Sequence, residues 1–112
     1  MSNLLQVVMR KLPRNLEDFE AKAGNVADIL AVLGNQRRLM VLCELWRTGG
    51  TSVNALADAV GLSQSALSQH LAKMREQGLV AFEREGQTLR YRVADSRLGS
   101  LLATLYDLYC ND

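Results

Sequence analysis

The stretch GLSQSALSQHL, residues 61–71, carries the strongest fold signal in this chain. Ser63 is a favoured N-cap, and the helix that it opens is predicted to run to about Gln77. Its apolar residues recur at helical spacing and predict its buried face: Leu67, Leu71 and Met74. A shorter apolar helix capped by Ser52 is predicted over residues 53–60, just before a glycine. Two short helices joined by a glycine-containing turn predict a helix-turn-helix.

Burying that apolar face turns polar side chains outward near the N-terminal end of the second helix. They are Gln64, Ser65, Ser68 and Gln69. In a helix-turn-helix this end of the helix enters the major groove, where glutamine and serine can bond base edges. We therefore predict that these side chains read bases, although polar residues on a helix often only meet solvent.

The periodicity changes from helical to alternating after the second helix. Residues 79–84 and 89–93 are predicted strands of a hairpin, joined by a turn at residues 85–88, with apolar residues of the second strand on one face and Arg90 and Arg92 on the other. Four residues of the hairpin are candidates for contacts with flanking phosphates or the minor groove: Arg84, Gln87, Thr88 and Arg90. Lys73 and Arg75 remain open as DNA contacts or as solvated charges.

Apolar seams also mark both ends of the chain. Six residues after Asn15, a plausible N-cap, follow heptad spacing and predict a helix that packs against another helix: Leu16, Phe19, Ala23, Val26, Leu30 and Leu33. Gly24 and Asn25 weaken this segment, so it could form one helix or two. A last helix carries a broad apolar stripe made of Leu98, Leu101, Leu102, Leu105, Leu108 and Tyr109. The domain prediction is an arm or short helix over residues 1–14, followed by one helix-turn-helix domain with terminal helices over residues 15–112.

The length, composition and motifs of the chain limit the classes of protein to which it can belong. With 112 residues, 48% hydrophobic and 22% charged, the chain is expected to form one globular domain. It lacks the apolar run of about 18 residues that a membrane span needs, and its early basic residues follow the apolar ones, so we expect a cytoplasmic protein. The net charge of +1 indicates no partner. The sequence contains no Cys-x-x-Cys, phosphate loop or triad spacing, so neither an enzyme nor a bound cofactor is expected.

The recognition-helix run at residues 61–71 and the segment REGQTLRY at residues 84–91 resemble the ArsR/SmtB family of bacterial winged helix repressors, with the resemblance extending from about Ala27 to Cys110. The resemblance implies a mainly α fold with a β-hairpin wing, an α+β winged helix-turn-helix. It also implies a homodimer that binds a near-palindromic operator through two recognition helices. The first and last helices would form the dimer through Leu16, Phe19, Ala23, Val26, Leu101, Leu105 and Leu108.

Many members of this family sense metals, and this chain departs from both of the family's sites. The thiol-rich site has two cysteines in the helix that here holds only Cys43, and the other site uses histidine on the last helix, where residues 95–109 contain none. His70 is expected to be packed or hydrogen-bonded at the edge of the core. A metal- or arsenic-responsive repressor therefore remains an alternative with few ligands to support it, and we predict no metal site.

The two cysteines, Cys43 and Cys110, match a subgroup of the family, the persulfide-sensing repressors of the BigR and SqrR type; the HlyU-like activators, which relieve silencing, look similar. The resemblance implies redox sensing, in which one thiolate attacks a sulfane sulfur and the second thiol resolves the product. A bridge with extra sulfur atoms can join thiols whose Cα atoms lie beyond the limit of about 7 Å for a disulfide. The apolar spacing of Leu39, Leu42, Cys43 and Trp46 predicts that Cys43 faces inward, which would raise its thiol pKa, whereas Arg47 could lower it. Without the resemblance, Cys43 reads as a small core residue and Cys110 as a tail thiol.

Overall fold

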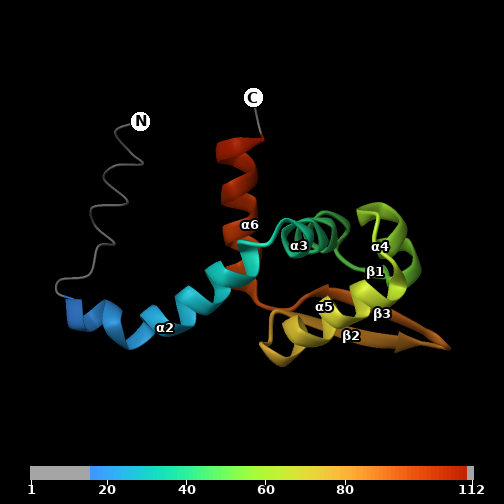
Figure 1. The fold of residues 1–112 in the computed structure, drawn as a ribbon, viewed down its shortest axis with the longest axis horizontal. Helices are drawn as coiled ribbons and strands as arrows, with labels where there is room; N and C mark the ends of the chain where they lie inside the picture. The colour runs from blue at the N-terminus through green and yellow to red at the C-terminus, as the bar shows by residue number, and fades with distance from the viewer. Residues whose placement is uncertain (1–15, 111–112) are drawn as a thin grey trace. The chain divides into compact units, whose positions relative to one another are not determined.

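The computed structural model describes residues 16–110 (Figure 1). The elements, in chain order, are α2 (Leu16–Leu33), α3 (Gln36–Thr48), β1 (Thr51–Ser52), α4 (Val53–Val60), α5 (Gln64–Glu76), β2 (Val80–Glu85), β3 (Thr88–Val93) and α6 (Ser96–Tyr109). This order confirms the predicted winged helix-turn-helix. The chain divides into two compact units, with the boundary between Ala31 and Val32. The predicted N-terminal arm and the Asn15 cap lie outside the described residues.

α2 is one continuous helix of 18 residues, so Gly24 and Asn25 do not break it. Its heptad seam is largely uncovered in the protomer, since Phe19 is 46% exposed and Leu30 is 55% exposed. Only Val32 and Leu33, its last two residues, are buried. Between residues 16 and 110 no helix is both long and apolar enough to cross a membrane.

Side-chain caps begin the next three helices, at Ser52 and Ser63 as the sequence predicts and also at Asn35. Asn35, Ser52 and Ser63 each accept a hydrogen bond from the backbone N–H three residues on, at 3.1 to 3.2 Å. Such a bond satisfies an N–H that has no partner within the helix. Gly49 and Gly61 end α3 and α4 in the left-handed conformation, which glycine adopts without steric cost. The predicted helix-turn-helix boundaries are therefore confirmed.

The wing is a three-stranded antiparallel sheet in the order β1-β3-β2. β2 and β3 form the predicted hairpin, and Gly86 takes the positive φ of 64° at its two-residue turn. β1 was not predicted, because two residues show no alternation. Gly50 precedes β1, and a Cβ atom there would lie 3.3 Å from both Arg90 Nε and the Tyr91 carbonyl oxygen. Its positive φ of 138° and this close approach both favour glycine.

The core lies between the helices and the apolar face of the sheet. Its largest fully buried side chains are Leu42, Leu45, Leu56, Leu67, Leu71, Met74, Leu98, Leu102, Val41 and Val80. The predicted inward face of α5 is therefore confirmed. The prediction for α3 is wrong in part, because Cys43 and Trp46 are exposed. The buried ridge of α3 consists of Val41, Leu42 and Leu45, so the helix is turned away from the predicted orientation and its Cys43 side borders an open pocket.

Candidate nucleic-acid interface and thiol site

The N-terminal half of α5 presents its predicted base-reading side chains to solvent. Gln64, Ser65, Ser68 and Gln69 are all exposed, opposite the buried face of the helix. The Gln64 amide donates a hydrogen bond to Asn54 Oδ1 of α4. This bond uses one of its two N–H donors, whereas no side-chain hydrogen bond is recorded for Ser65, Ser68 or Gln69 within the described residues.

The wing distributes its arginines over both faces of the sheet. Arg84 lies opposite Leu89 and Arg90 lies opposite Glu83, and paired residues of neighbouring strands share a face. Because the face alternates with each residue, Arg84 and Arg90 project from opposite faces. Arg90 and Arg92 therefore share one face, as predicted, and Arg84 lies on the opposite face. Gln87 and Thr88 are exposed at the tip.

Two further interactions hold arginine side chains against the wing. The Arg75 guanidinium lies over the Phe82 ring, 4.9 Å from its centroid, which holds the end of α5 against β2 through a cation–π contact. Arg92 Nε lies 3.9 Å from a Glu83 carboxylate oxygen, so part of its charge is neutralised within the sheet. The sequence did not decide whether Arg75 contacts DNA or only solvent. Its stacking depends on the Phe82 ring, which lies on β2 and not on the same helix.

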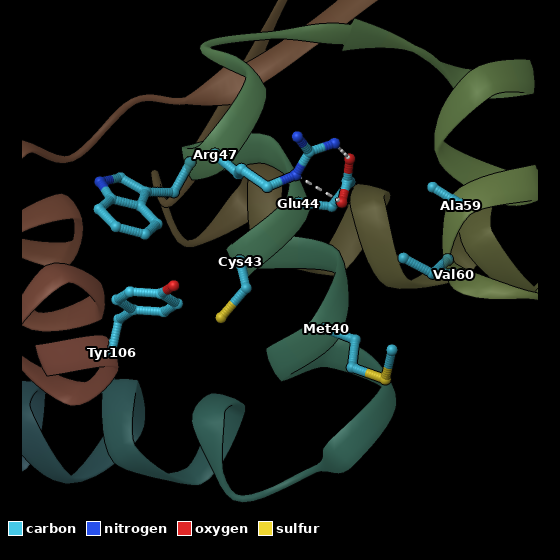
Figure 2. Close-up of a pocket in the computed structure, with 8 residues that line it drawn as sticks. Met40, Cys43, Glu44, Arg47, Ala59, Val60 and Tyr106 are labelled. Atoms are coloured by element: carbon cyan, nitrogen blue, oxygen red, sulfur yellow. Dashed lines mark hydrogen bonds and ion pairs between the residues drawn. The ribbon is translucent and has the colours of Figure 1, made fainter. Parts of the chain in front are cut away.

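Cys43 borders an open, mainly apolar pocket with a volume of about 570 Å³. The pocket is lined by Met40, Cys43, Glu44, Trp46, Arg47, Ala59, Val60 and Tyr106. Figure 2 shows the Cys43 side chain pointing toward Tyr106, while Arg47 reaches toward Glu44. Water reaches the thiol, yet the pocket walls remove part of its hydration.

The electrostatic environment of Cys43 raises its thiol pKa. Burial is the larger cause, and the negative charge of an ionised Cys110 is the second. Arg47 does not compensate, because its guanidinium forms an ion pair with Glu44. The sequence left open whether the pKa of Cys43 is raised by burial or lowered by Arg47. In the structure burial is the stronger effect, and the pKa is raised.

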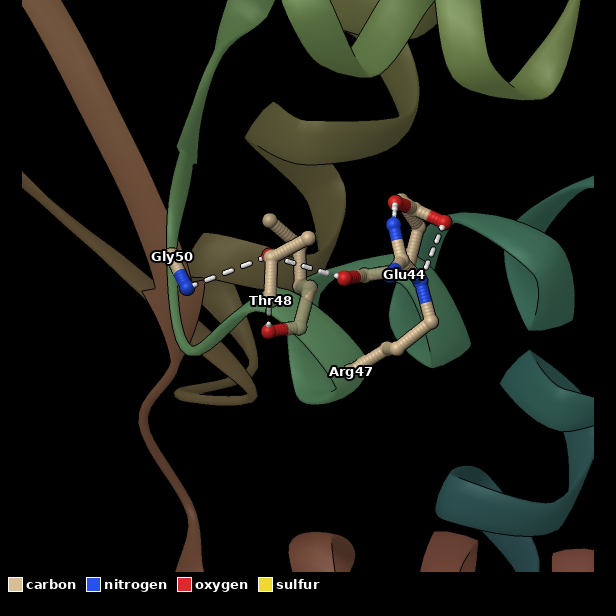
Figure 3. A network of polar contacts seen from close by, with 5 residues as sticks. Glu44, Arg47, Thr48 and Gly50 are labelled. Atoms are coloured by element: carbon tan, nitrogen blue, oxygen red, sulfur yellow. Dashed lines mark hydrogen bonds and ion pairs between the residues drawn. The ribbon is translucent and has the colours of Figure 1, made fainter.

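A polar network holds the end of α3, where this ion pair lies (Figure 3). The Thr48 hydroxyl donates to the Glu44 carbonyl at 2.9 Å and accepts a bond from the Gly50 N–H at 3.3 Å. These bonds connect the last turn of α3 to the chain that enters β1. The Glu44 and Arg47 pair is therefore part of an ordered helix end.

Cys110 directly follows the last turn of α6. It is a free, exposed thiol, and its N–H donates to the Tyr106 carbonyl at 2.8 Å. The rings of Tyr106 and Trp46 lie 6.1 Å apart between α6 and α3. Cys43 precedes Trp46 by three residues and Cys110 follows Tyr106 by four, so each thiol lies about one helical turn from this aromatic contact.

His70 is half-buried at the edge of the core, as expected, and its pKa is lowered by burial and then by the charges of Arg38, Lys73 and Arg37. Over residues 16–110 no three His, Cys, Asp or Glu side chains are grouped so that they could hold a metal ion.

The apolar stripe of α6 divides between core and surface, and its predicted dimerisation residues, Leu101, Leu105 and Leu108, lie outside the core. Leu98 and Leu102 are buried in the protomer, Leu101 and Leu105 are half-buried, and Leu108 is 62% exposed. On α2, Leu16 and Val26 are exposed and Ala23 is half-buried. Both helices therefore retain apolar surface that the protomer does not cover.

Comparisons with known proteins agree with this architecture. Residues 35–81 match the family described as bacterial regulatory protein, arsR family. The HTH-type transcriptional regulator YgaV of Escherichia coli is 38% identical over 85% of this chain and 96% of its own length. The chain belongs to the ArsR family. The transcriptional activator HlyU of Vibrio cholerae is also similar, at 37% identity over 91% of this chain and 94% of its own length.

Solved structures of relatives share the fold of this ArsR-family protein. Reduced HlyU from Vibrio cholerae aligns with a TM-score of 0.79 and 38% identity, covering 85% of this chain and 99% of that one. The transcriptional repressor BigR from Xylella fastidiosa aligns with a TM-score of 0.78 and 35% identity, covering 88% and 99%. The relatives are named as transcriptional regulators, and the chain is a DNA-binding transcriptional regulator of the ArsR family.

Proposed function

We propose that this protein is a dimeric repressor that acts in the cytoplasm and leaves its operator when reactive sulfur species bridge Cys43 and Cys110. The observation that carries the proposal is the packing of α3 against α6 through Trp46 and Tyr106, with Cys43 and Cys110 each about one helical turn from this contact; the charge of Cys110 also raises the pKa of Cys43. Both thiols are free and exposed, so a dissolved sulfur donor can reach either of them. A bridge between them would join the helix that precedes the helix-turn-helix to the last helix of the chain.

Dimerisation is supported by the uncovered apolar surface of the terminal helices. Leu16, Leu30 and Leu108 are each more than half exposed in the protomer. Covering such side chains contributes about 25 cal/mol for each Å² removed from water. A twofold dimer would present two α5 helices, and these can read half-sites about 34 Å apart on one side of the duplex.

Operator reading is assigned to the exposed N-terminal half of α5, with the wing as a backbone contact. Ser65 and Gln69 offer hydrogen-bonding groups to base edges, and Arg84 and Arg90 bring charge to the phosphates on either side of the sheet. Sequence specificity would therefore depend on α5, while the wing would contribute affinity that is sensitive to salt.

The bridging chemistry balances with a polysulfide as the only co-reactant. One cysteine thiolate attacks the central sulfur of H–S–S–S–H, forms Cys–S–S–SH and releases HS⁻. The second thiolate attacks the middle sulfur of that adduct, forms Cys–S–S–S–Cys and releases a second HS⁻. Two thiols are oxidised, two sulfur atoms of the donor are reduced to sulfide, and one sulfur atom remains in the bridge.

The bridge would act on DNA binding through the position of α3 and α6. Trp46 and Tyr106 already pack these helices together next to the thiols, so a covalent link there would restrict how they move against each other. A coupling of about 1 to 3 kcal/mol between bridging and DNA binding corresponds to a change in affinity of about 5- to 150-fold. That range is sufficient for a transcriptional switch.

An activator is the second candidate, because HlyU is named as a transcriptional activator and BigR as a repressor. The two functions differ in their genetic outcome. Deleting the gene of a repressor raises expression of its target genes, whereas deleting an activator that displaces a silencing protein lowers it.

Intact-protein mass spectrometry tests the sensing step directly. The wild type treated with polysulfide is expected to gain one sulfur atom and lose two hydrogens, and peroxide is expected to add no sulfur. Cys43→Ser and Cys110→Ser are each expected to form an open persulfide adduct but no bridge. A bridged mass in either single variant, or no added sulfur in the wild type, would contradict the proposal.

A further inference from the structure

A second group of cations lies beside α5, away from the wing. Arg37 and Lys73 are exposed, Arg38 is half-buried, and all three charges act on His70, which is half-buried on α5. Charges from the start of α3 therefore act on the middle of α5. Arg75, by contrast, stacks on Phe82 and belongs to the flank of α5 that carries the wing.

The helical positions put this group next to the base-reading surface. Lys73 follows Gln69 by four residues and so lies one turn further along the same exposed face of α5. His70 lies beside that face, between it and the buried stripe. When the N-terminal half of α5 lies in a major groove, the two groove walls are phosphate backbones; because the Arg75 flank meets the wing, we expect the His70 flank to face the opposite wall.

The cations are arranged to meet an external anion. Arg38 Nε donates to the Val32 carbonyl at 3.1 Å, which anchors that side chain at the start of α3. The first turn of α3 carries no acidic residue, so the positive end of its helix dipole adds to the same field. Within the part of the chain that the structure describes, neither Arg37 nor Lys73 takes part in an ion pair.

We propose that Arg37, Arg38 and Lys73, grouped around His70, form a second contact with the DNA backbone on the flank of α5 opposite the wing. The proposal rests on the DNA binding described above and extends it to phosphates on the other side of the groove. Phosphate is the ligand because guanidinium and ammonium groups bond its oxygens, and the neighbouring recognition surface makes the duplex its source.

This contact has a consequence for proton uptake. In the free protein burial and the three cations lower the pKa of His70, so its ring stays neutral down to a lower pH than usual. A phosphate placed among these cations offsets their repulsion, so the pKa of His70 rises in the complex. Binding then takes up a proton, and affinity increases as pH falls through the interval between the raised and the lowered pKa.

The test measures DNA affinity against salt concentration with an operator duplex selected from a random library. Arg37→Gln and Lys73→Gln are each expected to reduce the slope of log affinity against log salt by about 0.9 for every phosphate that the variant no longer neutralises, on operator and random DNA alike. Arg97→Gln is the matched control, because Arg97 is an exposed cation paired with Asp95 at the start of α6. It is expected to leave the slope unchanged, and circular dichroism checks that all variants fold.

A pH series completes the experiment. The wild type is expected to bind more tightly near about pH 6 than near about pH 8, and His70→Gln is expected to lose this dependence. Wild-type salt slopes in both charge variants, together with normal operator binding, would overturn the second contact and leave the proposed function standing. A wild type that selects no operator would overturn the proposed function and this contact together.

Discussion

Ionisation of Cys110, at the end of α6, raises the pKa of Cys43 on α3, so the two thiols of one protomer lie within electrostatic reach of each other. The Trp46 and Tyr106 rings connect the same two helices nearby. A bridge between sulfurs requires this arrangement, and the same repulsion disfavours the state in which both are thiolates. A sulfur donor is therefore expected to react with one thiolate first and with the other afterwards.

The first prediction concerns the reactivity of Cys43 as a function of pH. Because its pKa is raised, alkylation of Cys43 by iodoacetamide is expected to reach half its maximal rate above the usual pH range for a thiol. Cys110→Ser removes the repulsive charge and is expected to move this midpoint to lower pH, although burial keeps it above the usual range. Peptide mass spectrometry after timed alkylation measures both profiles. A midpoint that stays the same or rises in Cys110→Ser would show that the thiols do not interact.

The second prediction concerns the ion pair that occupies Arg47. Glu44→Gln leaves the Arg47 guanidinium uncompensated near Cys43, so the thiolate is stabilised and its pKa is expected to fall. Alkylation of Cys43 at neutral pH is then expected to be faster than in the wild type. Arg47→Gln is the matched control, since it removes the cation instead of freeing it, and it is expected to give no acceleration. Equal rates in all three proteins would show that Glu44 does not control the thiol.

The third prediction separates the residues of α5 by their hydrogen bonds. Gln69→Ala is expected to lower the affinity for the selected operator by about 1 to 3 kcal/mol and to leave binding to random DNA unchanged. Gln64→Ala is expected to have a smaller effect on specificity, because its amide already donates to Asn54. Fluorescence anisotropy with both duplexes measures these affinities. An equal loss on operator and random DNA would mean that Gln69 contacts phosphate and not a base.

The fourth prediction concerns the dimer. Phe19→Glu puts a charge into the exposed seam of α2 and is expected to convert the proposed dimer to monomers in analytical ultracentrifugation while the helical circular dichroism is retained. Leu102→Ala is the contrasting variant, because Leu102 is 1% exposed within the protomer. It is expected to lower the free energy of unfolding by about 2 to 5 kcal/mol. A Phe19→Glu variant that remains dimeric would remove α2 from the interface.

Most of the fold could be predicted because its signals are local. Asn35, Ser52 and Ser63 cap their helices through bonds to residues three positions away, and this pattern is visible in sequence. The change in periodicity after residue 78 likewise predicts the hairpin. β1 could not be predicted, since its two residues become a strand only by pairing with Tyr91 and Arg90 of β3.

The site was less predictable, because it depends on how helices turn and meet. The apolar spacing on α3 fits two orientations of the helix, and the predicted one buries Cys43; in the structure Val41 and Leu45 take the buried positions. The pairing of Arg47 with Glu44 and the stacking of Arg75 on Phe82 decide where those charges act. Neither contact can be inferred from the spacing of charged residues alone.

The decisive measurement is the operator affinity of protein whose Cys43–Cys110 bridge has been verified by intact mass, compared with the same protein after reduction of its thiols. The bridged protein is expected to bind about 5- to 150-fold more weakly, and reduction is expected to restore the affinity. Equal affinity of the two forms would contradict the proposed switch, and the two thiols would then have no part in releasing the protein from DNA.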